Sequence, residues 1–151
     1  LITEFPLSLL PTIFSRCQQI KFYPLPQKEI ESNFPKEIAE ISLGRPGRAI
    51  DFLDSQKLDN FKKDIKEVAN MVQADFGQRF QYAKEISQRD NLRETLTTWL
   101  FYFRNLLLEK YSTPGVEYYL NVLKKIQETN FLISTTNISK RLAIDVLMLE
   151  L

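Results

Sequence analysis

The chain of 151 residues contains no histidine, one cysteine and four glycines. Without histidine it cannot form a Ser-His-Asp or Cys-His nucleophile system, a histidine proton shuttle or a histidine-ligated metal site. The single cysteine, Cys17, excludes an internal disulfide, a CxxC redox pair and a zinc knuckle, and it suits a reducing cytoplasm. The glycines form neither the GxxxxGKS/T loop nor the GxGxxG loop that holds nucleotide phosphates. We therefore expect no nucleotide site of either kind, and no hydrolase of those types, within this stretch.

Charge and hydropathy exclude few further classes of protein. Twenty Lys and Arg residues stand against nineteen Asp and Glu residues, and the net charge of +1 does not support nucleic-acid binding by bulk charge. Hydrophobic residues make up 44% of the chain, enough to bury a core in one ordinary domain or two small ones. No uncharged stretch approaches the roughly 18 residues that a membrane span needs. Since the chain begins at Leu1 in an apolar run, we expect a piece of a longer protein. Since it shows neither a signal-peptide pattern nor a membrane span, we expect it to be soluble and cytoplasmic.

Prolines divide the chain near residue 55, because six of the seven lie in its first third. The sequence pattern of residues 1–23 predicts a strand remnant at their start, one helical turn, and a second strand through Ile20 and Phe22. The prolines at 24 and 26 then force an extended, stiff linker, which indicates a domain boundary.

The residues after this linker predict short helices. The stretch 28–41 indicates one or two of them, with Pro35 in a first helical turn. Gly44-Arg45-Pro46-Gly47 predicts a sharp turn into a helix over 48–53, and Pro46 suits its start.

From Ser55 onward, apolar residues recur every three or four positions, which predicts five amphipathic helices in a bundle rather than a sheet. Asn137 is the expected N-cap of the fifth helix. The residues expected on the buried faces are Leu58, Phe61, Ile65, Val68, Val72, Phe76, Phe80, Ala83, Ile86, Leu92, Leu96, Trp99, Leu100, Phe103, Leu106, Leu107, Val116, Tyr119, Leu120, Leu123, Ile126, Ile138, Leu142, Val146 and Leu149.

The most informative segment is Leu9-Leu10-Pro11-Thr12-Ile13-Phe14-Ser15-Arg16-Cys17-Gln18. Thr12 and Ser15 can cap a turn, and Arg16 can project a planar guanidinium toward a partner. On spacing and composition alone, a surface ion pair is the commoner use of such an arginine.

Three motifs in this chain, in order, resemble those of clamp-loader subunits of the AAA+ ATPase superfamily. Leu10-Pro11-Thr12-Ile13 with Ser15-Arg16-Cys17 resembles the SRC motif. Ser42-Leu43-Gly44-Arg45-Pro46-Gly47-Arg48-Ala49 resembles the start of the sensor-2 helix of the lid domain. Asn137-Ile138-Ser139-Lys140-Arg141-Leu142-Ala143-Ile144 with Leu147 resembles the last collar helix. By these motifs the chain is most similar to the delta-prime and gamma/tau subunits of bacterial DNA polymerase III.

The resemblance implies a mainly α chain with three parts. Residues 1–23 would end an α/β AAA+ nucleotidase-like core, residues 24–55 would form a small helical lid, and residues 56–151 would form a five-helix collar for oligomerisation. The chain would hold no cofactor and have no activity of its own. It would belong to a DNA polymerase III holoenzyme, a DNA-directed DNA polymerase with ATPase partners.

The resemblance also implies roles for single residues. Arg16 would act in trans as an arginine finger on ATP and Mg held by a neighbouring subunit, with Ser15 forming a turn hydrogen bond and Cys17 as a small buried thiol. The implied partners are the gamma/tau and delta subunits and, through the complex, the sliding clamp and primer-template DNA, with no membrane.

One departure bears on the type of subunit. The sensor-2 arginine of hydrolysing members falls on Gly47, which has no side chain to contact phosphate. We expect Gly47 to be a turn glycine, and this favours a delta-prime subunit. A shift of one residue would place Arg48 there and favour a gamma/tau-type ATPase, which an intact upstream GxxxxGKS/T loop and Walker B motif would also indicate. The third alternative is an unrelated helical adaptor.

The remaining features have simpler interpretations. The aromatic run 99–103 is expected to serve packing rather than base stacking, with Leu100, Phe101 and Leu107 facing another subunit. Basic pairs with acidic neighbours are interpreted as solvated faces; they are Lys62-Lys63, Lys124-Lys125 and Lys140-Arg141, with Asp59, Asp64, Glu67, Glu128 and Asp145. The carboxylate pairs Asp51 with Asp54 and Glu37 with Glu40 lack companion ligands and are expected to be exposed.

Overall fold

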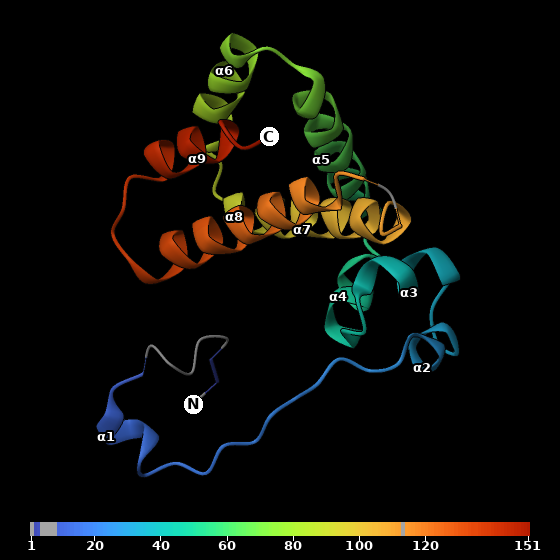
Figure 1. Ribbon diagram of the computed structural model, residues 1–151. Helices are drawn as coiled ribbons and strands as arrows, with labels where there is room; N and C mark the ends of the chain where they lie inside the picture. Colours follow the sequence, from blue (N-terminus) through green and yellow to red (C-terminus); the bar gives the residue numbers. More distant parts are fainter. Residues whose placement is uncertain (1, 4–8, 113) are drawn as a thin grey trace. The chain divides into compact units, whose positions relative to one another are not determined.

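The computed structural model describes residues 2–3, 9–112 and 114–151 (Figure 1). Within these ranges the chain forms nine helices and no strand, so the predicted mainly helical class is confirmed. The chain divides into two compact units, residues 1–49 and residues 50–151. Its predicted division into three parts stays a prediction. In the described ranges, no helix combines the length and the apolar character that crossing a bilayer requires.

Prolines mark the starts of the first four helices. Their bounds are α1 Pro11–Phe14, α2 Gln27–Glu31, α3 Lys36–Ser42 and α4 Pro46–Asp51. Proline occupies the N-cap of α2 and α3 and the first helical position of α1 and α4, where its missing N–H has no helical partner to lose. The one or two short helices predicted for 28–41 are two, α2 and α3, and Pro35 is the N-cap of α3 instead of lying in its first turn. The apolar interior of the first unit consists of Ile30, Ile38, Ala39, Ile41 and Ala49.

The predicted second strand through Ile20 and Phe22 is wrong. Residues 18–26 belong to no helix or strand, and the side chains of Ile20 and Phe22 are 75% and 93% exposed. A strand needs a neighbouring strand to pair its N–H and C=O groups, and the described ranges contain none. Of the strand remnant predicted at the start, Leu1 lies outside the described residues and Ile2 is in no strand.

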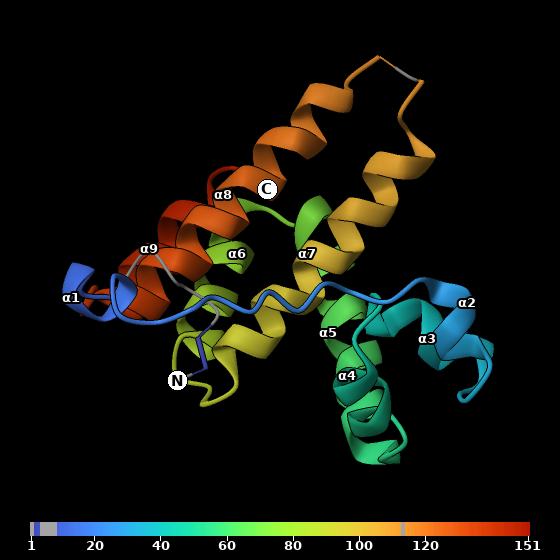
Figure 2. The same ribbon diagram turned by 90° about the horizontal axis from the view of Figure 1, so that it is seen from below.

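The second unit contains the five predicted helices. They are α5 Ser55–Gln73, α6 Phe76–Ile86, α7 Leu92–Glu109, α8 Val116–Thr135 and α9 Lys140–Met148. The long helices α7 and α8 lie side by side, α9 contacts both α6 and α8, and α5 contacts α7 (Figures 1 and 2). The carboxylates of Asp54 and Asp75 cap α5 and α6. The cap of α9 is Ser139 instead of the predicted Asn137.

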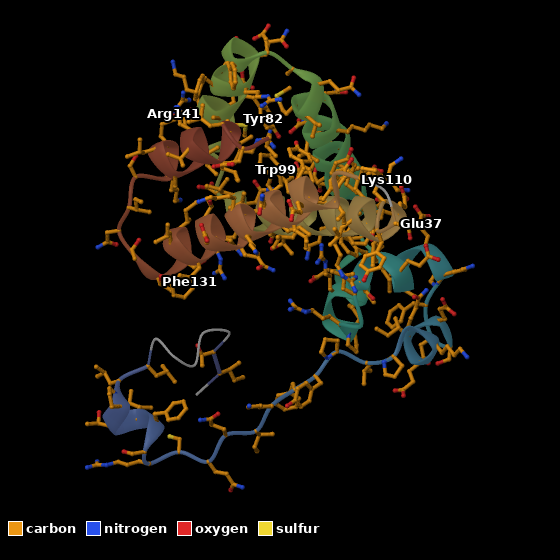
Figure 3. All side chains as sticks on the ribbon, viewed as in Figure 1. Glu37, Tyr82, Trp99, Lys110, Phe131 and Arg141 are labelled. Atoms are coloured by element: carbon orange, nitrogen blue, oxygen red, sulfur yellow. The ribbon has the colours of Figure 1, made fainter. Side chains whose placement is uncertain are left out.

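Helix α7 forms the centre of this unit. Its Leu96, Trp99 and Phe103 are fully buried. The ring of Tyr82 from α6 stacks on Trp99, with 6.1 Å between centroids and 19° between planes (Figure 3). The other buried members of the cluster are Val68, Ala83, Ile86, Leu92, Val122, Ile126, Ile144, Leu147, Met148 and Leu151. The buried faces predicted for α5 and α7 are largely confirmed.

The buried face predicted for α9 is wrong. Ile138, Leu142, Val146 and Leu149 are between 37% and 57% exposed. The residues of α9 that enter the core are instead Ala143, Ile144, Leu147 and Met148. Both faces of this helix are apolar, and the repeat of three and four residues does not say which one docks. Phe76 and Leu120, also expected to be buried, are exposed.

Candidate functional site

The segment around Arg16 is one short helix and the turn that ends it. Pro11 starts α1, and the C-cap residue Ser15 retains helical backbone angles. The Ser15 hydroxyl donates to the carbonyl of Thr12 at 3.3 Å, which is the turn hydrogen bond expected of it. The backbone N–H of Arg16 donates to the carbonyl of Ile13 at 3.1 Å, so the turn continues to the base of the arginine side chain.

The Arg16 side chain is exposed. Within the part of the chain that the structure describes, it makes no ion pair and no side-chain hydrogen bond, so the surface ion pair expected from spacing alone is absent. Cys17 is exposed as well, so its expected burial is not found among the described residues. The guanidinium is therefore available to a group outside the described chain.

The turn before α4 depends on Gly44. Leu43 and Gly44 both have left-handed backbone angles, with φ of 54° and 77°. The Gly44 carbonyl accepts a hydrogen bond from the Leu25 N–H at 2.7 Å. A Cβ atom at Gly44 would lie 2.5 Å from the Leu25 carbonyl oxygen, so only glycine fits without a shift of the backbone.

Gly47 is not the turn glycine it was expected to be. It lies inside the first turn of α4, its φ is not positive, and a Cβ atom there would meet nothing within 4 Å. A side chain at this position would have room. Arg45 is exposed, whereas Arg48 is half-buried and already engaged with other groups. No hydrogen bond of Arg16 reaches residues 44–48 in the described ranges, and the structure does not join these two segments into one pocket.

A polar cluster that the sequence analysis missed ties α6 to α5. Arg89, in the turn after α6, donates to Asp64 at 3.3 Å and to Glu67 at 3.0 Å. Glu67 also accepts the hydroxyl of Tyr82 at 2.7 Å. Asp64 had been interpreted as part of a solvated face, but it is buried. Arg89 lies 25 and 22 residues from its carboxylate partners, a separation that no local spacing rule covers.

Burial sets the protonation behaviour of this cluster. Removal from water raises the pKa of the Asp64 carboxyl above its ordinary value, and the Thr95 hydroxyl and Arg89 only partly oppose this. Burial, together with the hydrogen bond to Glu67, also raises the pKa of Tyr82. With their polar groups directed at one another, these side chains join helices and do not form an open catalytic centre.

A second missed residue, Arg79, connects two helix ends. It donates from Nε to the carbonyl of Met71 at 3.0 Å and from Nη2 to that of Val72 at 2.9 Å, both at the end of α5. Its Nη1 donates to the carbonyl of Met148, the last residue of α9, at 3.3 Å. The carbonyls that end a helix lack helical partners and attract cations, so one guanidinium satisfies both ends.

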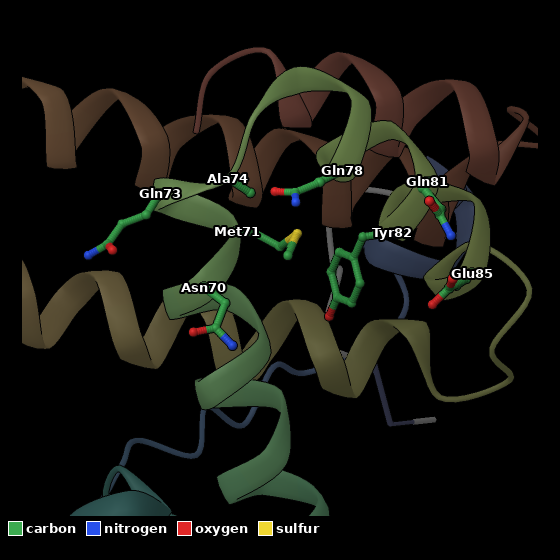
Figure 4. Close-up of a pocket in the computed structure, with 8 residues that line it drawn as sticks. All are labelled: Asn70, Met71, Gln73, Ala74, Gln78, Gln81, Tyr82 and Glu85. Atoms are coloured by element: carbon green, nitrogen blue, oxygen red, sulfur yellow. The ribbon is translucent and has the colours of Figure 1, made fainter.

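A groove of about 520 Å³ lies where α5 ends and α6 begins (Figure 4). Its lining is rich in carboxamides, and it contains none of the predicted site residues. The residues around it are Asn70, Met71, Gln73, Ala74, Gln78, Gln81, Tyr82 and Glu85. It has neither a nucleophile paired with a base nor a group of metal ligands, so it carries no catalytic assignment.

The aromatic run of α7 serves packing, as expected. Trp99 and Phe103 are buried, and the ring of Phe101 contacts that of Phe61, with 5.4 Å between the ring centroids. Contact of Leu100, Phe101 and Leu107 with another subunit stays a prediction. Leu100 packs against the core, and all three side chains are only partly exposed.

Several charged residues behave as expected. Lys125 pairs with Glu128, and Arg141 pairs with Asp145. Asp51 pairs with Lys57, and all four residues of the carboxylate pairs are exposed. In the described ranges, no group of three or more His, Cys, Asp or Glu residues is placed to hold a metal ion.

These observations define a mainly helical protein with a five-helix unit and, on a short N-terminal turn, an exposed arginine that is unpaired among the residues the structure describes. Compared with protein-family models, with curated proteins and with solved structures, the chain matches none.

Proposed function

We propose that this chain is part of a non-hydrolysing clamp-loader subunit of the delta-prime type, which contributes Arg16 in trans to the ATP site of a neighbouring ATPase subunit. The observation that carries the proposal is the exposed Arg16 side chain, free of partners in the described part of the chain, at the end of a hydrogen-bonded turn. A guanidinium held this way can neutralise charge on a phosphoryl group during transfer.

The helix that resembles sensor 2 supports a non-hydrolysing subunit. Gly47 has space for a side chain but lacks one, so packing does not account for the absence of an arginine at this position. Arg48, which a shift of one residue would bring to the same place, is already engaged with other groups. Both observations favour the delta-prime type over a gamma/tau-type ATPase.

The five-helix unit supports a collar role. In the proposed subunit it would associate with related helical units of other subunits, with ATP and Mg bound by the neighbour and the sliding clamp and primer-template DNA reached through the assembled complex. The unit supplies exposed apolar side chains on α8 for such contacts.

The test is the replacement of Arg16 by Ala in the full-length subunit, reconstituted with its partner subunits, the clamp and primed DNA. DNA-dependent ATP hydrolysis by the complex should fall by about 10³–10⁵-fold, the range measured for arginine fingers. Assembly, followed by size-exclusion chromatography, should not change because the side chain is exposed.

The matched control is Arg104→Ala, which removes another exposed arginine, on α7. It should leave ATP hydrolysis unchanged. Wild-type turnover by a complex that contains Arg16→Ala would remove the arginine-finger role.

A further inference from the structure

One face of α9 lacks a partner among the described residues of the second unit. Leu142, Val146 and Leu149 follow one another at spacings of four and three residues, so they share one side of α9, and Ile138, just before its N-cap, is exposed as well. We call these four residues the α9 face. Large apolar side chains that gather on one exposed helix side are typical of an interaction surface.

We propose that the α9 face binds the α9 face of a second copy of this chain, with the two helices antiparallel. The opposite side of α9 is fixed in the core by Ile144, Leu147 and Met148, so the α9 face cannot turn inward without unpacking the unit. A two-fold axis through the middle of the face would bring each apolar residue against the same set in the other copy.

The charges along one edge of the face complement themselves in this arrangement. Arg141 and Asp145 are one helical turn apart and form an ion pair of 2.7 Å. In an antiparallel pair, the edge that carries Arg141 and Asp145 in one copy lies beside the same edge of the other copy. Because the second helix runs in the opposite direction, the order of its two charges is reversed. Arg141 of each copy then lies level with Asp145 of the other, which gives alternating charges across the contact.

The other edge is complementary as well. Glu150 is exposed and follows the last turn of α9. In the register that sets Arg141 level with Asp145, it lies just beyond the N-terminal end of the second copy's α9, which Ser139 caps. The first turn of a helix presents unpaired N–H groups and a partial positive charge, and a carboxylate there is favourable. Both edges therefore favour a second copy in the antiparallel direction.

This inference goes beyond the proposed function, because the partner is a second copy and not a different subunit. It uses none of residues 1–49, so a failure of the Arg16 experiment would leave it intact. The reverse also holds, since the Arg16 experiment does not require self-association.

Sedimentation velocity of the 151-residue chain tests the proposal. With rising concentration, the wild-type mass should increase from 17.7 kDa toward twice that value. Leu142→Glu should weaken self-association at least about tenfold, as expected for a central apolar contact. Leu108→Glu is the matched control, because Leu108 is as exposed as Leu142 but lies on α7, and it should leave association unchanged. Circular dichroism melting checks that each variant is folded.

A charge exchange tests the direction of the helices. Arg141→Glu alone and Asp145→Arg alone should each associate more weakly than wild type, because each places like charges across the contact. Their equimolar mixture should associate again, since the mixed pair restores opposite charges at both levels. A wild-type chain of 17.7 kDa at every concentration would overturn the proposal. So would equal weakening by Leu108→Glu and Leu142→Glu, or a mixture no stronger than its separate components.

Discussion

Arg79 and Arg89 both make polar connections between distant parts of the five-helix unit. Arg79 joins the ends of α5 and α9, and its partner Met148 is 69 residues away in sequence. Arg89 joins two carboxylates of α5. Neither arginine belongs to a local sequence pattern. The sequence also does not show which backbone carbonyls at helix ends an arginine side chain will reach. The partners of Arg79 and Arg89 can be identified only from the arrangement of the helices in the structure.

Asp64 shows the cost of burying a charge. Its carboxylate contacts Arg89 at 3.3 Å, but removal from water outweighs this attraction and raises the pKa of Asp64 in the folded protein. A group with a raised folded pKa stabilises the fold below its unfolded pKa, which is about 4. That contribution is lost as the pH rises through the folded pKa.

Replacement of Asp64 by Asn should therefore change how stability depends on pH. The amide resembles the protonated carboxyl and cannot ionise. The free energy of unfolding of Asp64→Asn, minus that of the wild type, should increase as the pH rises from below about 4 toward neutrality. Urea unfolding of both proteins at several pH values measures this difference. A difference that is constant or decreases over this window would contradict the burial argument.

The helices themselves were predictable from local chemistry. Proline at the starts of α1 and α4, and apolar residues every three or four positions from α5 onward, indicated where helices form. The orientation of α9 was not predictable, because its two opposite sides are both apolar. The predicted strand through Ile20 and Phe22 was wrong for a related reason, since strand pairing depends on a neighbouring strand that the local sequence does not contain.

The glycines at the start of α4 allow a matched test of this element. Gly44→Ala should destabilise the first unit by at least about 1 kcal/mol, because alanine is strained at positive φ and its Cβ would meet the Leu25 carbonyl. Gly47→Ala should stabilise it by about 0.5–1 kcal/mol, because the residue is helical and a Cβ there has room. Hydrogen exchange of the Leu25 amide, which donates to Gly44, reports both effects. Equal exchange rates in the two variants would show that the turn does not depend on Gly44.

At the scale of the whole molecule, the sequence predicted the local structure around Arg16 better than the burial of that segment. The turn hydrogen bond of Ser15 was expected and is present, while the burial of Cys17 was expected and is absent. A motif of three consecutive residues can be recognised in the sequence. The burial of Cys17 depends instead on which other residues of the protein pack against it. The partial burial of Phe101 likewise depends on another helix, because the ring of Phe61 on α5 packs against it.

The two units differ in the size of their interiors. The first unit buries a few small and medium apolar side chains, and the second buries the only tryptophan together with a cluster drawn from α5–α9. Because buried apolar area supplies most of the stability of a domain, the first unit should be the less stable of the two.

This difference should separate the unfolding of the units in urea. Trp99 fluorescence reports only the second unit, while far-ultraviolet circular dichroism reports helices in both. We expect the dichroism signal to begin its decrease at a lower urea concentration than the fluorescence signal. Gly44→Ala should move only the early part of the dichroism curve and leave the Trp99 midpoint in place. Coincident curves, or an equal shift of both signals in Gly44→Ala, would mean that the chain unfolds as one cooperative body.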